Sequence, residues 1–269
     1  MKLSNEELFK YLEFAKEFSN VAGQVMIKYF NGSNEANYKS DQTIVTKADT
    51  EINELLISSV KEKFPDHSVD GEESKFGLSN YVWVCDPIDG TAMYARNIPV
   101  AVFSLALVID GVPVLGVVYD PFTNNLYSAI KGNGAYKNGE LIRVSDAMLG
   151  SQGCFSNFDV WPTADYDIFD ILKELGAKVW FVDLGSVIRA SMCVATGDFC
   201  FSIFPGTVGK YCDLAAVKII VEEAGGKVTD LFGNEQRYDT NINGALISNG
   251  LVHSEIVDVV NKYLTNIKG

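Results

Sequence analysis

The stretch CDPIDGT, residues 85–91, combines residue types that can bind a cation and an anion side by side. It follows YVWV, whose aromatic and β-branched residues predict a buried strand that ends at the two aspartates. Two aspartates three residues apart can point the same way in a turn, and the proline between them fixes the backbone. Such a pair can share a hard cation such as Mg²⁺, which prefers oxygen ligands. The N–H groups of Gly90 and Thr91, at the start of an expected helix, would form an adjoining anion site. Together they predict a place for phosphate.

Three further segments place carboxylates where elements are expected to begin or end: Asp49 in TKAD, Glu72 and Glu73 in GEES, and Asp213. An aspartate at a helix start is commonly an N-cap, so Asp49 and Asp213 taken singly also have a structural interpretation. We expect Glu72 to face inward and Glu73 to be solvated, since both cannot face inward from an extended loop. At an effective dielectric constant of about 20, two carboxylates roughly 4 Å apart repel by about 4 kcal/mol, so a cluster of them needs a bound cation.

The length and composition favour one soluble domain. The chain has 269 residues, of which 47% are hydrophobic, and no proline-rich or low-complexity linker interrupts it. This is enough for a substantial core. We expect a single domain over 1–269, built from two closely packed halves at about 1–150 and 151–269, with ligands bound in the crevice that they share.

The charge excludes several classes of partner. A net charge of −13 argues against nucleic acid, because binding phosphates electrostatically needs clustered lysine and arginine. No apolar run of 18 residues appears, and the N-terminus is acidic where a signal peptide would be apolar. We therefore expect a cytoplasmic protein that binds neither nucleic acid nor membrane, and that handles phosphate only with the help of a divalent cation.

The cysteines and histidines give weak alternatives to carboxylate chemistry. The five cysteines are scattered without a C-x-x-C pair and are interpreted as reduced core residues. Cys212 is a poor candidate for a nucleophile. His67 is expected in a loop and His253 on the surface of the last helix, so a histidine-based triad or metal site is disfavoured.

The first half of the chain combines two helices with an antiparallel sheet. Apolar residues recur at helical spacing over 5–30, and a polar loop follows over 31–45. A second helix begins near Thr46 and ends before Pro65. Its predicted buried side consists of Ile52, Leu55, Leu56, Ser59 and Val60. Strands are expected over 100–109, 112–119 and 125–130, and Asp110-Gly111 predicts a hairpin between the first two.

After about residue 150 strands and helices alternate. Strands are expected over 178–182, 199–204, 227–231 and 244–248, and helices over 164–176, 185–197, 213–226 and 251–264. This pattern is typical of helices that cover a mixed sheet. The overall class is therefore α/β or α+β.

These motifs together resemble the inositol monophosphatase family, whose members are Mg²⁺-dependent and lithium-sensitive phosphatases. GEES (71–74), DPIDGT (86–91) and CDLAAVKIIVEEAGG (212–226) carry the resemblance in the family's order, supported by TKAD (46–49) and GSVIRASMCVATGD (185–198). It spans about residues 36–250. It implies a layered αβαβα sandwich that is usually a homodimer, with two or three Mg²⁺ ions in each site and a small phosphate monoester as substrate.

The resemblance also implies roles for particular residues. The implied metal ligands are Glu72, Asp86, Asp89, Asp213 and the carbonyl of Ile88, with Asp49 linked to a third metal through water. The implied substrate-binding residues are Asp89, Gly90, Thr91, Gly185, Ser186 and Lys39. The Thr91 hydroxyl would help to orient the attacking water, and Glu72 or Asp49 could take its proton. Gly185 and Ser186 would line the leaving-group side, and Lys39 would lie near the phosphate.

Departures from the family pattern leave the substrate open. The family usually has tryptophan before its last aspartate, where this chain has Cys212 preceded by Tyr211. Inositol-specific members have a glutamate upstream of that aspartate, whereas 201–212 contains Lys210 and no carboxylate. We therefore expect inositol 1-phosphate to be a poor substrate.

The alternative substrates are histidinol phosphate, fructose bisphosphate and adenosine bisphosphate. Arg96 and NIPV (97–100) weakly favour the histidinol phosphate branch. An alternative of another class is a non-catalytic metal-binding protein that regulates a partner.

Overall fold

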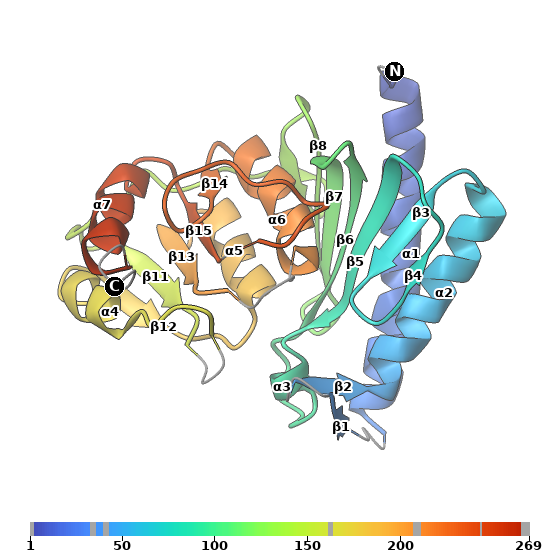
Figure 1. Cartoon of the computed structure of the whole chain (residues 1–269), viewed down its shortest axis with the longest axis horizontal. Coiled ribbons are helices and arrows are strands. Elements are labelled where there is room, and N and C mark those ends of the chain that lie inside the picture. Colours follow the sequence, from blue (N-terminus) through green and yellow to red (C-terminus); the bar gives the residue numbers. More distant parts are fainter. Residues whose placement is uncertain are drawn as a thin grey trace.

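The computed structural model describes residues 3–32, 36–39, 43–160, 164–206, 211–242 and 244–264, and it has five layers (Figure 1). Helices α1 (Asn5–Phe30) and α2 (Lys47–Lys63) cover the outer face of a large sheet. Helices α5 (Val187–Ala195) and α6 (Cys212–Glu223) lie between that sheet and a smaller one. Helices α4 (Phe169–Leu175) and α7 (His253–Leu264) cover the smaller sheet's outer face. This confirms the expected αβαβα sandwich.

The larger sheet has eight strands among the described residues, in the order β10-β9-β8-β7-β6-β5-β3-β4. Its strands are β3 (Ser68–Gly71), β4 (Lys75–Phe76), β5 (Tyr81–Asp89), β6 (Val102–Ile109), β7 (Val112–Asp120), β8 (Asn125–Ile130), β9 (Ala135–Lys137) and β10 (Glu140–Leu141). Strands β3 and β5 run parallel, and the other neighbours are antiparallel. Asp110 and Gly111 both have positive φ angles, 52° and 81°, in the predicted hairpin between β6 and β7.

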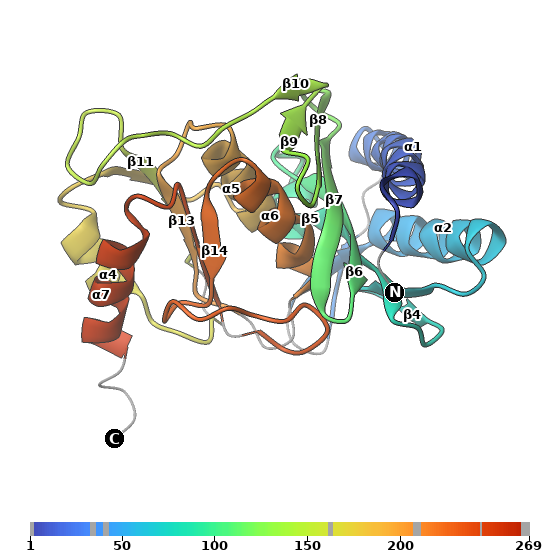
Figure 2. The same ribbon diagram turned by 90° about the horizontal axis from the view of Figure 1, so that it is seen from above.

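The smaller sheet has five described strands in the order β12-β11-β13-β15-β14 (Figure 1). Seen from above, α5 and α6 lie between this sheet and the larger one (Figure 2). They are β11 (Phe155–Phe158), β12 (Trp180–Val182), β13 (Phe201–Phe204), β14 (Lys227–Thr229) and β15 (Ala245–Ser248). Strand β11 pairs in parallel with β12 and β13, and the remaining pairs are antiparallel. The sheet is mixed, as expected, but β11 was not among the predicted strands.

Three short strands lie where polar loops were expected. Strands β1 (Ala36–Tyr38) and β2 (Ile44–Thr46) form a small antiparallel pair that leads directly into α2. Strand β3 occupies part of the predicted GEES loop, and its parallel pairing with β5 sets the register of both. The helix expected after CDPIDGT is a single turn, α3 (Thr91–Tyr94).

Two burial predictions were wrong. Leu55, expected on the buried side of α2, is 37% exposed, while Asn53 is fully buried and bonds to the backbone of Ser74. His253, expected on the surface, is only 3% exposed and lies between the hydroxyls of Thr229 and Ser248, at 3.0 and 2.8 Å from its two ring nitrogens. Asn53 and His253 are buried because each has specific hydrogen-bond partners.

In the part of the chain that the structure describes, none of the helices combines the length and the apolar character that a membrane span needs.

Candidate metal and phosphate site

A cavity of about 600 Å³ opens between the two halves of the chain. Residues of CDPIDGT line one side, and residues of the second half line the other. The predicted site residues on its wall are Glu72, Asp86, Ile88, Asp89, Gly90, Thr91, Gly185, Ser186 and Asp213. Four of the five motifs therefore meet around one cavity, whereas Asp49 of TKAD and Lys39 do not line its wall.

Three of the predicted carboxylates form a compact cluster. Glu72, Asp86 and Asp213 each place an oxygen within 4.8 Å of the other two. Glu72 and Asp86 come from neighbouring strands, because Gly71 at the end of β3 pairs with Cys85 in β5. Asp213 comes from the first turn of α6 in the other half, and its Oδ1 accepts a hydrogen bond from Cys212 Sγ at 3.3 Å. Oxygens at this spacing fit a hard divalent cation.

The DPIDGT backbone turns sharply beside this cluster. The register of β5 against β6 shifts between Asp86 and Asp89. The N–H of Ile88 donates to Asp86 Oδ1 at 3.0 Å, and Thr91 Oγ1 donates to the carbonyl of Ile88 at 2.7 Å. Gly90 has a φ of 84°, and a Cβ there would lie 3.0 Å from the carbonyl oxygen of Gly185. Glycine is required at this position by both its conformation and its close approach to the other half.

Asp89 is bonded to the start of α5. Its Oδ2 accepts hydrogen bonds from Ser186 Oγ and from the N–H of Ile188, the latter at 2.9 Å. Asp89 is not one of the three carboxylates in the compact cluster. Ser186 is buried and also caps α5 by accepting from the N–H of Arg189 at 3.1 Å. Asp89 and Ser186, predicted as substrate-binding residues, therefore also connect the two halves of the molecule.

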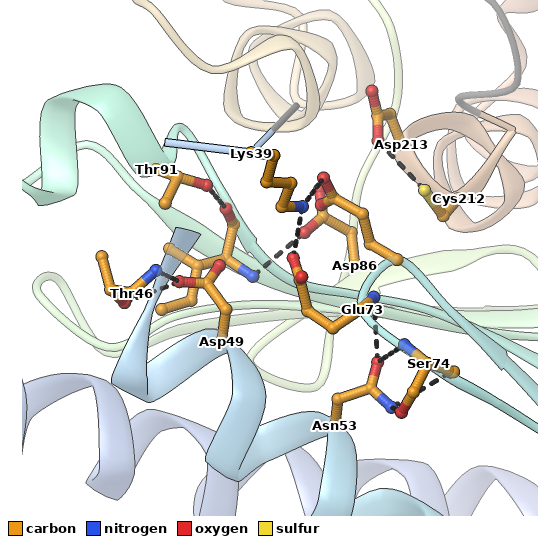
Figure 3. A network of polar contacts seen from close by, with 12 residues as sticks. Lys39, Thr46, Asp49, Asn53, Glu73, Ser74, Asp86, Thr91, Cys212 and Asp213 are labelled. Atoms are coloured by element: carbon orange, nitrogen blue, oxygen red, sulfur yellow. Dashed lines mark hydrogen bonds and ion pairs between the residues drawn. The ribbon is translucent and has the colours of Figure 1, made fainter. Parts of the chain in front are cut away.

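The two carboxylate oxygens of Asp49 have different surroundings (Figure 3). Oδ2 accepts hydrogen bonds from the N–H and the hydroxyl of Thr46, at 2.8 and 2.6 Å, and so caps α2. Oδ1 is buried and has no hydrogen-bond partner among the described residues. Burial raises the pKa of Asp49 to about 7, against the lowering effect of the Thr46 hydrogen bonds, and Glu72 and Glu73 raise it further. Asp49 is therefore not the N-cap residue, which is Thr46, but the third helical residue of a capping box, and its Oδ1 has no hydrogen-bond partner among the described residues.

Lys39 binds both glutamates of GEES (Figure 3). Its Nζ lies 3.0 Å from Glu72 Oε1 and 2.6 Å from Glu73 Oε1, and both glutamate side chains are only 13% exposed. The expectation that Glu73 is solvated was therefore wrong, because one ammonium group holds both carboxylates inward. Burial by itself would lower the pKa of Lys39, but the two glutamates outweigh it and raise that pKa. The N–H of Glu73 also donates to Asn53 Oδ1 at 3.3 Å, which fixes the turn.

Two carboxyl groups on the cavity wall were missed by sequence reasoning. Asp159, directly after β11, is 6% exposed, and Asp183 precedes α5. Burial, followed by Asp183, Asp89 and Asp213, raises the pKa of Asp159 well above its ordinary value. Asp183 Oδ1 accepts a hydrogen bond from the N–H of Gly185 at 2.8 Å. A carboxylate at the end of a strand is the pattern that predicted Asp86, and the same pattern could have predicted Asp159.

Part of the second-half segment cannot be placed in this site. Residues 207–210, which include Lys210, lie outside the described residues. The segment 201–212 has no carboxylate, but Asp159 and Asp183 bring two to the same cavity. The reason for expecting inositol 1-phosphate to be a poor substrate is therefore lost.

Comparisons with known proteins identify the family to which the sequence and the fold are similar. The model of the inositol monophosphatase family matches residues 7–265. A Thermotoga maritima protein named fructose-1,6-bisphosphatase/inositol-1-monophosphatase is 32% identical, covering 96% of this chain and 98% of that protein. The structure of a Thermotoga maritima IMPase is similar with a TM-score of 0.86 and 30% identity, covering 96% of this chain and 99% of that one. An IMPase/NADP phosphatase solved with Mg²⁺ and phosphate has a TM-score of 0.78 and 26% identity, covering 95% of both chains.

Proposed function

The chain belongs to the inositol monophosphatase family, and we propose that it hydrolyses a small phosphate monoester with Mg²⁺ bound between its halves. The main observation that supports this proposal is the cluster of Glu72, Asp86 and Asp213 beside the Gly90-Thr91 turn. Relatives named as phosphatases make this chain a phosphoric monoester hydrolase. Because the cavity takes residues from both halves, we propose that 1–269 acts as one domain.

We propose that the cavity binds two or three Mg²⁺ ions. The proposed ligands are Glu72, Asp86, Asp89, Asp213 and the carbonyl of Ile88, with Asp49 acting through water. The donors fit this ion because all are oxygens, and because Asp49 Oδ1 is buried without a hydrogen-bond partner among the described residues. When bound, the metal would lower the pKa of a water molecule and stabilise the leaving oxygen.

The residues of the turn then hold the phosphate and the attacking water. The N–H groups of Gly90 and Thr91 would bind phosphate oxygens, while Lys39 would balance the negative charge nearby. Thr91 Oγ1 donates its own hydrogen to Ile88, so its free lone pairs can accept a hydrogen bond from the attacking water. In-line attack by this water would give phosphate and the free alcohol without a covalent intermediate.

Either Asp49 or Glu72 would accept the proton of the water. A pKa of about 7 supports Asp49, because a general base works best when its pKa is near the working pH. Glu72 is ion-paired with Lys39 and belongs to the compact carboxylate cluster, which supports a role as a metal ligand.

The leaving group is proposed to carry hydrogen-bond donors. Asp159 and Asp183 line the cavity beside Gly185 and Ser186, the proposed leaving-group side. Carboxyl oxygens there would accept hydrogen bonds from hydroxyl or ammonium groups, and the Asp183 carboxylate would repel a second phosphate. This favours inositol phosphate and histidinol phosphate over fructose bisphosphate and adenosine bisphosphate.

A phosphate-release assay tests these proposals. It compares kcat/KM for inositol 1-phosphate, histidinol phosphate, fructose 1,6-bisphosphate and adenosine 3′,5′-bisphosphate, at saturating Mg²⁺ and with chelator. We expect release that chelator abolishes, with the two monophosphates as the better substrates. Turnover that survives chelator would contradict the metal, and a bisphosphate as the best substrate would contradict the role of the carboxyl groups.

We also propose a homodimer in the cytoplasm. Strand β12 lies at the edge of the smaller sheet and exposes Trp180, Phe181 and Val182, and apolar strand edges of this kind are commonly covered by another chain. Five free cysteines are typical of a reducing compartment. Light scattering of the purified protein tests the dimer, and Trp180→Lys should shift it toward the monomer.

A further inference from the structure

Two of the three clustered carboxylates, Glu72 and Asp213, belong to segments that are joined by a hydrogen bond. Asp70 precedes Glu72 by two residues, and Tyr211 precedes Asp213 by two. The hydroxyl of Tyr211 donates a hydrogen bond to Asp70 Oδ2. Lys75 Nζ lies 2.8 Å from Asp70 Oδ1 and donates to the Tyr211 hydroxyl at 3.1 Å. This contact joins strand β3 in the first half to the start of α6 in the second.

The three carboxylates of the cluster differ in how their positions are fixed. Glu72 and Asp86 are held by the pairing of β3 with β5, which continues as a hydrogen bond from the N–H of Glu72 to the carbonyl of Cys85 at 3.0 Å. Asp213 belongs to a helix from the other half of the chain. Its distance from the first two therefore depends on how the start of α6 is held against the large sheet.

The start of α6 lacks the usual side-chain cap. Tyr211 is the N-cap residue, and its side chain makes no capping hydrogen bond to the helix. Instead this side chain, 8% exposed, reaches across to Asp70. The interaction that fixes the helix start is thus made with the strand that carries Glu72.

The Tyr211–Asp70 hydrogen bond is the strong part of this contact. Its acceptor is a carboxylate, and hydrogen bonds to ionised groups are stronger than those between neutral groups. Lys75, which faces Asp70 across the β3–β4 pair, has a side chain that is 67% exposed, so solvent weakens its ion pair. Lys75 therefore orients the Asp70 carboxylate more than it holds the two halves together.

We propose that Tyr211 and Asp70 form a positioning pair that sets the distance between Asp213 and Glu72 and thereby the affinity for the divalent cation. The inference rests on the proposed function, because it takes these carboxylates as metal ligands. Neither residue of the pair would touch the substrate. Without the hydrogen bond, Asp213 can move away from Glu72 and Asp86, and the cation must draw it back when it binds.

The test is Tyr211→Phe, which keeps the ring and removes only the hydroxyl. Binding of Mg²⁺ is measured directly by calorimetry, and kcat is measured at saturating Mg²⁺. We expect the dissociation constant for Mg²⁺ to rise about 5- to 10-fold, the effect of one lost hydrogen bond, with kcat within about twofold of wild type. A general structural defect would instead lower kcat at saturating Mg²⁺ as well. Tyr119→Phe is the matched control, because it removes a tyrosine hydrogen bond to Asn124, at 2.9 Å, from residues that do not line the cavity.

Three further variants test whether Asp70 is the hydrogen-bond partner through which Tyr211 acts. Asp70→Ala should weaken Mg²⁺ binding as much as Tyr211→Phe, and the double variant should be no weaker than either single variant, because all three lack the same hydrogen bond. Asp70→Asn, which keeps an acceptor, should retain most of the affinity. Wild-type affinity in Tyr211→Phe, or additive losses in the double variant, would overturn the positioning pair alone. A wild-type protein that binds no Mg²⁺ would overturn both this pair and the proposed function.

Discussion

Asp49 should make the metal-free protein less stable as the pH rises. Its carboxyl group is buried, one oxygen has no hydrogen-bond partner among the described residues, and its pKa is raised to about 7 from an ordinary 3.8. The perturbation is Asp49→Asn, which removes the charge but keeps an oxygen that can accept the two hydrogen bonds from Thr46.

The direction in which the free energy of unfolding changes with pH follows from proton binding. Between pH 4 and pH 7 the folded protein holds a proton on Asp49 that the unfolded chain has released, so the free energy of unfolding falls as the pH rises. The loss is complete above the folded-state pKa. Each unit of pKa corresponds to about 1.4 kcal/mol, so the two units between pH 5 and the raised pKa give a loss of about 3 kcal/mol between pH 5 and pH 8.

Urea unfolding with chelator, at several pH values from 5 to 8, measures this effect. The free energy of unfolding of Asp49→Asn minus that of wild type should increase by about 3 kcal/mol over the range. Other buried carboxyl groups such as Asp159 titrate in both proteins and cancel in the difference. Parallel pH curves for the two proteins would refute the reasoning, because they would mean that Asp49 has the same pKa in the folded and unfolded chain.

Three further changes test the site. Mg²⁺ should raise the melting temperature relative to chelator, because a ligand bound only by the folded state stabilises it, and equal midpoints would count against a metal site. Thr91→Ala should lower kcat by about tenfold or more, since it misplaces the attacking water. The dissociation constant for Mg²⁺ should stay nearly unchanged, and a wild-type kcat would show that Thr91 does not orient the water. Gly71→Ala should lower the free energy of unfolding in urea by roughly 1–3 kcal/mol, since its Cβ would lie 2.0 Å from Asn53 Oδ1; no loss would mean that Asn53 moves freely.

Several elements of the fold could be predicted because they depend on local patterns. The apolar spacing of 5–30 predicted α1 over its whole length, and the Asp110-Gly111 signal predicted the β6–β7 hairpin. The motif CDPIDGT predicted a strand that ends at the two aspartates. In each case the residues that determine the structure are close together in the sequence.

The environment of single side chains could not be predicted in this way. Glu73 faces inward because Lys39, more than thirty residues away in the sequence, binds it together with Glu72. His253 is buried because two hydroxyls from β14 and β15 reach its ring. Both outcomes depend on partners brought together only by the fold, and burial of a polar group is decided by such partners.

The connections between the halves explain why the site needs the whole fold. Asp89 of the first half bonds to the start of α5, and Tyr211 at the start of α6 bonds to Asp70 of the first half. The N-terminus of α5 is therefore held by a proposed metal ligand, Asp89, and that of α6 by a carboxylate close to one, Asp70. A change that loosens either contact would separate carboxylates that already repel one another. The affinity for the cation and the packing of the two halves are thus expected to change together, so the metal should contribute to stability mainly by holding the halves in contact.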